Sequence, residues 1–486
     1  MANFDWFLVS PVICLAAFGL LTMILVPICR GQSRLLAIPT FFGLAVTGFA
    51  LIRLWSQWVA AGPQETAFGL VRIDGFGLFF SILLLVVTLL AVLLSMTFIE
   101  REGADQGEFY ALMLFCLAGM FVMLQTTHLM VILIGLEIFS LALYVLCGLT
   151  RGRVRSIEAA LKYFLLGAFS SGFVVYGMAM LYGGSGTLEL SGIGNALMSD
   201  GSNMLLWIGM ALVFVGLAFK IAVVPFHQWV PDVYTGAPTN ITGFMAAATK
   251  TAIFAVFLRF LFGAFGGSSD VWIPLVFWLA IATMTVANLV ALAQTNLKRL
   301  LAFSSIAHAG YLLIAVTCTP VAGISAILFY LVSYAIMTIG AFACLTAVGR
   351  GDADNERGYT LSEWAGIGWS RPMLGLAMTF FMFSLAGIPP TGGFFGKYVI
   401  FKAAIESQQY TLAVIGMLNA AVAAFYYLRI IMTMYMREAE EGAEQPLPVP
   451  LAVGAVLILS AAGVIYLGIA PGRLLDLIAG LAHNLI

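Results

Sequence analysis

Long apolar segments recur along the whole chain of 486 residues, and they restrict its fold more than any other feature. A run of about twenty apolar residues has the length that crosses the hydrocarbon core of a bilayer as an α-helix. Hydrophobic residues make up 62% of the sequence and charged residues only 9%, which lies outside the range of water-soluble domains. The sequence therefore predicts an integral membrane protein.

The runs are all expected to be helical, because a backbone inside lipid must satisfy its own hydrogen bonds. The predicted fold class is an all-α integral membrane protein with about fourteen transmembrane helices. The first run starts after Asp5 and Trp6, without a basic leader, and is interpreted as a retained helix, not a signal peptide. The runs lie near residues 8–29, 36–58, 76–99, 109–126, 128–149, 159–182, 204–224, 241–264, 272–293, 300–318, 321–348, 373–404, 411–436 and 449–470.

The distribution of arginine and lysine between the loops predicts the orientation. If the first helix runs from outside to inside, three basic residues face outward, namely Arg53, Arg72 and Arg473. Basic residues concentrate on the cytoplasmic side of membrane proteins, so this orientation is favoured and both termini are predicted on the periplasmic side. The inner loops then hold Arg30, Arg34, Arg101, Arg151, Arg153, Arg155, Lys298, Arg299, Arg350, Arg357, Arg371 and Arg437.

The remaining basic residues lie in or near the predicted spans. Four of them, Lys162, Arg259, Lys402 and Arg429, are near estimated helix ends, where a long side chain can reach the interface. Lys220, Lys250 and Lys397 lie deeper, as does the carboxylate Glu137. A charge at bilayer depth costs roughly 3 kcal/mol, so these four residues need partners, water or both, and are candidate functional residues.

Two proline-rich interruptions coincide with deep lysines. Pro225 cannot donate to the helical ladder, so the helix that starts near residue 204 is expected to end close to Lys220. The segment from Gly387 to Gly393 interrupts a second helix just before Lys397. Lys220 would then lie at the negative end of a half-helix and Lys397 near the positive end of another, which predicts that Lys220 holds its proton more firmly.

Broken helices in corresponding places of two halves are typical of transporters built from inverted repeats. The sequence is accordingly divided into an N-terminal three-helix segment, two inverted five-helix repeats, and an acidic loop followed by helix 14. The four parts are residues 1–107, 108–264, 265–436 and 437–486.

His308 follows Ser304 and Ser305 at helical spacing, which places a titratable ring and two hydroxyls near one face. A single histidine in a bundle is often only a hydrogen-bonded core residue. Here Lys250 and Lys397 flank it in the sequence, and a role in proton transfer is favoured. For His227 the two interpretations are equally supported.

No motif in the sequence indicates a cofactor, a metal or nucleic acid. The Gly-x-Gly steps at 75–77, 192–194 and 366–368 lack the third glycine of a dinucleotide loop. The segment Gly392–Lys397 does not fit a phosphate loop, because Thr391 occupies the position of the first glycine and Tyr398 that of the required serine or threonine. The four histidines and six cysteines show no metal-ligand spacing.

Two motifs carry a family resemblance. The segment Lys220-Ile221-Ala222-Val223-Val224-Pro225-Phe226-His227-Gln228-Trp229-Val230-Pro231-Asp232, continued to Thr239, resembles the signature of the antiporter-like membrane subunits shared by respiratory complex I and Mrp cation/proton antiporters. The segment Lys298–Tyr311 is also similar to that family, and the resemblance covers about 110–435. Lys397 stands where M-type subunits typically carry glutamate, and L-type subunits continue into a long lateral helix, so the sequence resembles the N-type branch.

The resemblance implies roles for individual residues. Glu137 and Lys220 correspond to the carboxylate–lysine pair of a first half-channel, Lys250 to a central lysine and Lys397 to a terminal one, with His308 on the axis between the last two. It also implies a proton-translocating subunit in a bacterial inner membrane, with other membrane subunits of complex I and membrane lipids as partners. NADH, FMN, iron–sulfur clusters and quinone are then expected on partner subunits.

Two other functions are compatible with the sequence. One is a subunit of a multi-subunit Na⁺/H⁺ antiporter of the Mrp type. The other is a non-conducting scaffold in which buried charges only fix helix packing.

Overall fold

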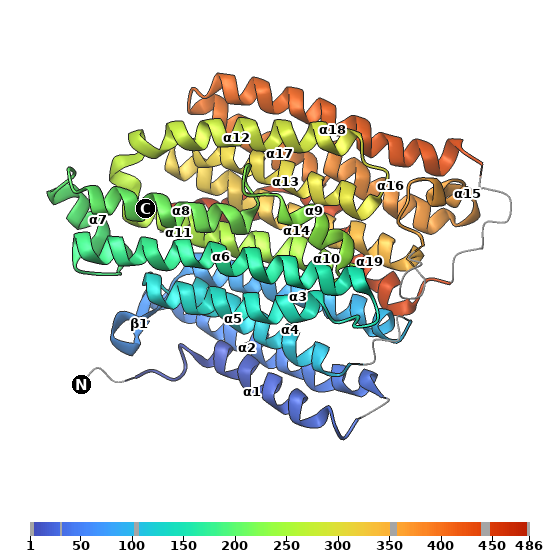
Figure 1. Cartoon of the computed structure of the whole chain (residues 1–486), viewed down its shortest axis with the longest axis horizontal. Helices are drawn as coiled ribbons and strands as arrows, with labels where there is room; N and C mark the ends of the chain where they lie inside the picture. The colour runs from blue at the N-terminus through green and yellow to red at the C-terminus, as the bar shows by residue number, and fades with distance from the viewer. Residues whose placement is uncertain (1–3, 30–31, 102–105, 350–356, 439–447, 484–486) are drawn as a thin grey trace.

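The computed structural model describes residues 4–29, 32–101, 106–349, 357–438 and 448–483. Long helices lie side by side along the horizontal direction of Figure 1 and make up nearly all of the described chain. The only strands in these ranges form a small antiparallel hairpin, in which Glu65 lies opposite Arg72. The predicted all-α membrane fold is confirmed.

The elements follow one another along the chain in three groups. The N-terminal segment holds α1 (Ser10–Leu25), α2 (Ala37–Ala61), β1 (Gln64–Thr66), β2 (Val71–Ile73) and α3 (Gly75–Arg101). The next group comprises α4 (Glu108–Leu124), α5 (Leu129–Cys147), α6 (Val154–Ser185), α7 (Leu190–Ser199), α8 (Met204–Ile221), α9 (Trp229–Gly236), α10 (Thr239–Phe244), the π-helical segment Met245–Thr249 and α11 (Lys250–Phe265). The last comprises α12 (Ser269–Leu292), α13 (Leu297–Val316), α14 (Pro320–Val348), α15 (Ile367–Ser370), α16 (Pro372–Ala386), α17 (Gly392–Glu406), α18 (Tyr410–Met436), α19 (Leu451–Ile469) and α20 (Gly472–His483).

Ten helical stretches of the described chain are long and apolar enough to span a membrane. One of them, Thr239–Leu292, runs from α10 through the π-helical segment and α11 to the end of α12. Shorter apolar helices are Ser10–Leu25, Glu108–Leu124 and Pro372–Ala386. Both expected interruptions are present, between α8 and α9 and between α16 and α17. The count of fourteen spans and the boundaries of the two inverted repeats stay predictions.

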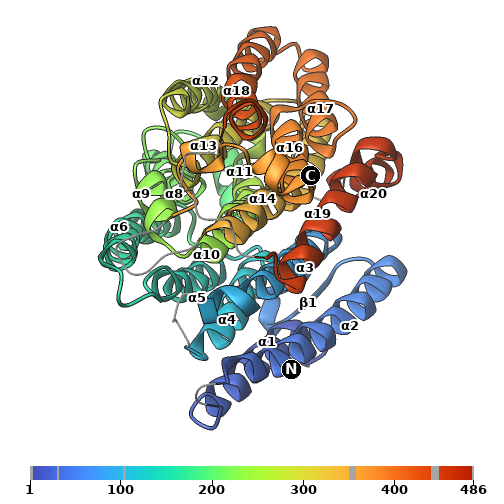
Figure 2. The same cartoon turned by 90° about the vertical axis from the view of Figure 1, so that its right-hand side faces the viewer.

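The inside of the bundle is formed by α13 and α14, which are buried along most of their length. In contrast, less than half of each of α6, α18 and α19 is buried, and α1 and α2 lie along one edge of the bundle (Figure 2). Polar side chains on α13 and α14 are therefore kept away from lipid. This makes the two helices the natural support for a polar pathway through an apolar bundle.

The two ends of the bundle separate the predicted outer and inner loops. The elements β1 and α7, from segments predicted to face outward, lie at the left-hand end in Figure 1. The short helix α15, from a segment predicted to face inward, lies at the opposite end. Arg30, Arg350 and most of the acidic loop after 437 lie outside the described residues. Lys298 is not in a loop as predicted, because it is buried at the start of α13 and donates to the carbonyl oxygen of Ala237 at 2.8 Å.

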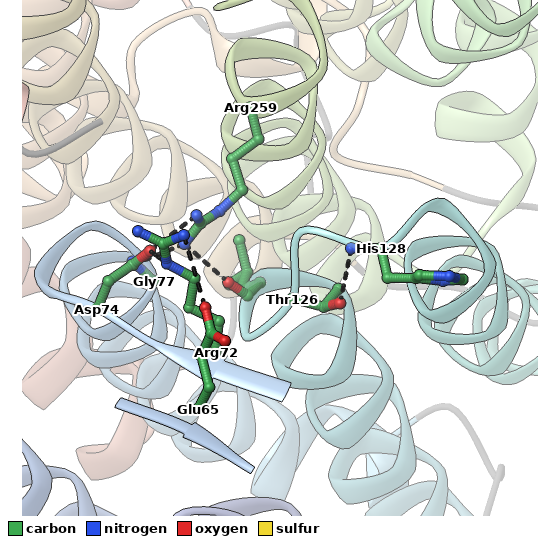
Figure 3. A network of polar contacts seen from close by, with 8 residues as sticks. Glu65, Arg72, Asp74, Gly77, Thr126, His128 and Arg259 are labelled. Atoms are coloured by element: carbon green, nitrogen blue, oxygen red, sulfur yellow. Dashed lines mark hydrogen bonds and ion pairs between the residues drawn. The ribbon is translucent and has the colours of Figure 1, made fainter. Parts of the chain in front are cut away.

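An ion pair links the N-terminal segment to the C-terminal half of α11 (Figure 3). Asp74 precedes α3 and accepts two hydrogen bonds from the Arg259 guanidinium, at 2.8 and 2.6 Å, and both residues are buried. Arg259 also donates to the carbonyl oxygen of Leu124 at the end of α4, at 3.2 Å. Of the interpretations that the sequence left open for Arg259, reaching the interface does not hold, because the side chain is buried with its counter-ion inside the protein. The ring of His128 points away from this cluster in Figure 3.

Replacing Asp74 should leave Arg259 without a counter-ion. We expect Asp74→Asn to cost about 3 to 5 kcal/mol, because Arg259 would keep a buried charge without a counter-ion. The abundance and thermal stability of the chain in membranes measure this loss. Glu65→Gln is the control on the same hairpin, since Glu65 is largely exposed and 3.8 Å from Arg72; we expect it to cost less than about 1 kcal/mol. Equal losses in the two variants would contradict the anchoring role.

The same pair predicts a pH dependence. Burial alone would raise the pKa of Asp74, but Arg259, the Gly77 amide and Arg72 outweigh burial and lower this pKa below its ordinary value. A carboxyl with a lower pKa in the folded state stabilises fully above its unfolded pKa, near ~4, and loses that contribution as the pH falls further. The stability difference between the wild type and Asp74→Asn should therefore stay constant from neutral pH to about 4 and narrow below it. A constant difference in strong acid would contradict this.

Candidate functional site: a buried row of lysines and a histidine

The helix α8 ends where the sequence predicts. Lys220 lies in its last turn, and Ala222 follows in the left-handed conformation with φ of 63°. The amides of Ala222 and Val223 return to the carbonyl oxygens of Phe219 and Ala218, at 3.1 and 2.9 Å, which satisfies the end of the helix. Val224 and Pro225 then join through a cis peptide bond before α9 begins. The break therefore holds the Lys220 side chain inside the bundle, where it is 3% exposed.

Lys220 is held by hydroxyl groups of α5. Its Nζ donates to Ser140 Oγ at 2.9 Å and to the Tyr144 hydroxyl at 3.3 Å. Glu137 lies one turn before Ser140 on the same helix and accepts a hydrogen bond from Ser171 of α6, at 2.5 Å. Glu137 and Lys220 interact electrostatically without direct contact. Glu137 and Ser140 lie one turn apart on α5, and Ser140 contacts Lys220. The helix α5 therefore places the two members of the predicted pair near each other.

Lys250 lies at the start of α11 and reaches α13. Its Nζ donates to Ser305 Oγ at 2.7 Å and to the carbonyl oxygen of Ser305. It also lies 5.4 Å from the centre of the Tyr334 ring, and the Tyr334 hydroxyl donates to Ser305 Oγ at 2.8 Å. Lys250 is thus connected through one serine to α14.

His308 is buried among tyrosines. Its Nδ1 is hydrogen-bonded to the Tyr330 hydroxyl, and its Nε2 lies 3.2 Å from the Tyr427 hydroxyl. Tyr427 is also hydrogen-bonded to Ser304 Oγ, one turn before His308 on α13. Ser304 and His308 therefore meet at one phenol, as the spacing on the helix suggests, whereas Ser305 faces Lys250.

Lys397 lies against the second break. Its Nζ donates to the carbonyl oxygens of Leu385 and Ala386, at 3.0 and 2.8 Å, in the last turn of α16. The same Nζ lies 5.2 Å from the centre of the Tyr311 ring, which contacts the His308 ring edge to face. Lys397 lies near the N-terminus of α17, as predicted, but its ammonium group reaches back to the negative end of α16. The predicted order of proton affinity for the two lysines loses its basis.

The hydrogen-bond partners of Glu137, the first two lysines and His308 were not predicted from the sequence. They are hydroxyl residues, and a hydroxyl in an apolar helix carries no charge to mark it. A weak signal exists, because Ser140 and Tyr144 follow Glu137 at helical spacing, as Tyr334 follows Tyr330. The missed residues are Ser140, Tyr144, Ser171, Tyr330, Tyr334 and Tyr427.

We refer to Glu137, Lys220, Lys250, His308 and Lys397 as the row. The other basic residues of the spans lie outside it. Lys162 is partly exposed and pairs with Glu158 and Asp232, at 2.7 and 2.8 Å. Lys402 is exposed and lies 3.7 Å from Glu406. Arg429 donates to the carbonyl oxygens of Leu292 and Gln294, at 2.8 and 2.5 Å, where α12 ends.

His227 is partly buried just beyond the α8 break, and its Nδ1 has no hydrogen-bond partner within the described chain. In the described ranges, no group of three histidine, cysteine or acidic residues is close enough to hold a metal ion.

The fold and the site together define a polytopic membrane protein with a buried row of titratable groups at two broken helices, which is the arrangement of an ion-translocating subunit. The model of the family described as NADH:quinone oxidoreductase/Mrp antiporter, TM matches residues 126–423. The chain belongs to this family, and the resemblance found in its motifs is confirmed.

Related proteins align with this chain along nearly its whole length. NADH-quinone oxidoreductase subunit N of Trichlorobacter lovleyi is 44% identical over 471 residues, which cover 96% of this chain and 95% of the relative. Subunit N 1 of Solibacter usitatus is 43% identical, covering 98% and 96%. These names agree with the N-type resemblance.

Solved structures support the fold. A chain of respiratory complex I from Thermus thermophilus with bound aureothin has a TM-score of 0.79 and 36% identity, covering 96% of this chain and 98% of that one. A chain of the Mrp complex from Dietzia has a TM-score of 0.87 and 22% identity, covering 99% and 98%, and shows a shared fold alone.

The second break predicts a steric effect. A Cβ atom on Gly393 would lie 1.9 Å from the carbonyl oxygen of Ser384, which is backbone and cannot move aside. We expect Gly393→Ala to destabilise the region around Lys397 by at least about 1 to 3 kcal/mol and to lower the amount of folded chain in membranes. Gly454→Ala on α19 is the control, because no atom lies within 4 Å of its added Cβ. A normal level of Gly393→Ala would contradict the close packing at this break.

Proposed function

We propose that this chain is the N-type, proton-translocating membrane subunit of an NADH:quinone oxidoreductase, and that protons move along Glu137, Lys220, Lys250, His308 and Lys397. The support comes from the 44% identity to a subunit N over most of both chains and from the buried row described above. Redox energy would come from other subunits, which carry NADH, FMN, iron–sulfur clusters and quinone. The partners in the membrane are the other membrane subunits of that complex and lipids.

One contrast carries the proposal. Arg259 shows how this protein holds a buried cation for structure, with a carboxylate in two-point contact. Within the described chain, Lys220, Lys250 and Lys397 instead contact hydroxyl and carbonyl oxygens, and none forms a direct ion pair. A lysine held by neutral groups can lose its proton, because no buried carboxylate is then left without a counter-ion. Such groups suit proton transfer better than permanent locking of helices.

The chain is proposed to cross a bacterial inner membrane with both termini on the periplasmic side. The loop arginines favour this orientation. The position of β1 and α7 at one end of the bundle and of α15 at the other is consistent with it (Figure 1).

Removing the first lysine tests the relay. In inverted membrane vesicles, we expect Lys220→Ala to lower NADH-driven proton pumping by about 10²-fold or more, which is the contribution of a positioned proton-transfer group, while the complex assembles normally. Lys402→Ala is a matched control, because this lysine is exposed and paired only with Glu406 one turn away. Normal pumping by Lys220→Ala in an assembled complex would overturn the relay.

A variant of Lys250 can distinguish a transport function from a scaffold function. Lys250→Met keeps much of the side-chain volume and removes the charge. A scaffold tolerates this change, because an apolar residue of similar volume replaces a buried charge without loss of packing. We expect an assembled complex with about 10²-fold less pumping. Full pumping would favour the scaffold, and transport that requires sodium in the wild type would favour the Mrp-type antiporter.

A further inference from the structure

A small cavity lies between the first two lysines of the row. It is formed where the α8 break, α9, the π-helical segment and α13 meet. Its free volume is about 10 Å³, which is close to the space that one buried water molecule requires. Residues on its wall include Lys220, Ala222, Tyr234, Thr249, Lys250 and Ser305.

A water molecule is stable in such a site only if two to four polar groups surround it. The residues on its wall with polar side-chain groups are the lysines Lys220 and Lys250 and the hydroxyl residues Tyr234, Thr249 and Ser305. Ser305 already contacts Lys250 and Tyr334. Of the three hydroxyl residues, Thr249 is the one whose oxygen is buried without a hydrogen-bond partner within the described chain.

Thr249 differs from the other threonines of its helical stretch. Its side chain is buried, with 4% exposed, and within the described chain its hydroxyl has no hydrogen-bond partner. By contrast, the hydroxyl of Thr251 donates to the Ala247 carbonyl oxygen at 2.8 Å, and that of Thr242 donates to the Pro238 carbonyl oxygen at 3.1 Å. A buried hydroxyl without a partner costs free energy, so its orientation needs a reason.

The π-helical segment Met245–Thr249 supplies the local cause. A threonine in a regular α-helix can donate to the carbonyl oxygen of the preceding turn. A π turn contains an additional residue and shifts that carbonyl away from its usual place, and such turns are frequent at functional sites. Thr249 is the last residue of the segment, and both Thr249 and Lys250 line the cavity.

We infer that the Thr249 hydroxyl holds one water molecule between Lys220 and Lys250, and that this water carries a proton from the first lysine to the second. The inference rests on the proposed relay and assigns Thr249 as a positioning residue. In the transfer, an N–H bond of the Lys220 ammonium breaks as the proton joins the water oxygen. One O–H bond of the water breaks as its proton joins the unprotonated Lys250, so the water is regenerated and the total charge is unchanged.

Three single variants of the intact complex test the inference. Thr249→Val keeps the shape and removes the hydroxyl, and we expect proton pumping about fivefold slower, as for the loss of one hydrogen bond. The solvent deuterium isotope effect on pumping should rise, because proton transfer becomes slower than the other steps. Thr249→Ser restores a hydroxyl and should pump as the wild type does. Thr251→Val is the matched control, since it removes a hydroxyl that bonds within the same helix, and should leave the isotope effect unchanged.

The outcomes separate this inference from the relay itself. If Thr249→Val pumps normally while Lys250→Met does not, the relay stands and the positioning role of Thr249 is overturned. If Thr249→Ser is as slow as Thr249→Val, or if the isotope effect does not change, the effect is one of packing and the inference fails. Water density beside Thr249 in a high-resolution map of the wild-type complex, absent from the map of Thr249→Val, would support it directly.

Discussion

A membrane interior provides no hydrogen-bond partners, so each group that leaves a regular helix must find its partner within the protein. In this chain, that constraint determines both breaks. After Lys220 the backbone amides of Ala222 and Val223 fold back onto α8. At the second break the carbonyl oxygens of Leu385 and Ala386 are satisfied by the side chain of Lys397. Backbone amides close both breaks, since those of Gly387 and Ile388 also fold back onto α16. Only the second break has, in addition, the side chain of a residue proposed to carry protons.

Two kinds of buried cation follow from this constraint. Arg259 and Arg429 serve packing, through the carboxylate of Asp74 and through carbonyl oxygens at the end of α12. Lys220, Lys250 and His308 are hydrogen-bonded to serine and tyrosine hydroxyls, whereas Lys397 donates to backbone carbonyl oxygens. Hydroxyl groups both donate and accept, so they remain satisfied in either protonation state of their neighbour. These surroundings therefore allow the buried group to be charged or neutral. A carboxylate partner would instead hold it in the charged state.

The membrane class, the helical fold and the α8 break could be predicted from sequence, because apolar length and proline act locally along the chain. The family resemblance could also be recognised, since its motif is a continuous segment from Lys220 to Thr239. Contacts between distant segments could not. Asp74 and Arg259 are 185 residues apart in sequence, and this distance concealed the pairing and made Arg259 resemble an interfacial residue. Lys397 was misjudged for a related reason, because its backbone position after the break does not show that its long side chain reaches back across it.

The link between Asp74 and Arg259 limits how far this chain could be shortened by design. A variant that began at α4 would keep Glu137, the three lysines and His308. It would nevertheless leave the Arg259 guanidinium without its counter-ion, on the same helix that carries Lys250. A minimal translocation module would therefore have to replace that arginine by an apolar side chain, or obtain a carboxylate from another element. The three N-terminal helices contribute no residue to the row, but they neutralise a charge that the row's own helix carries.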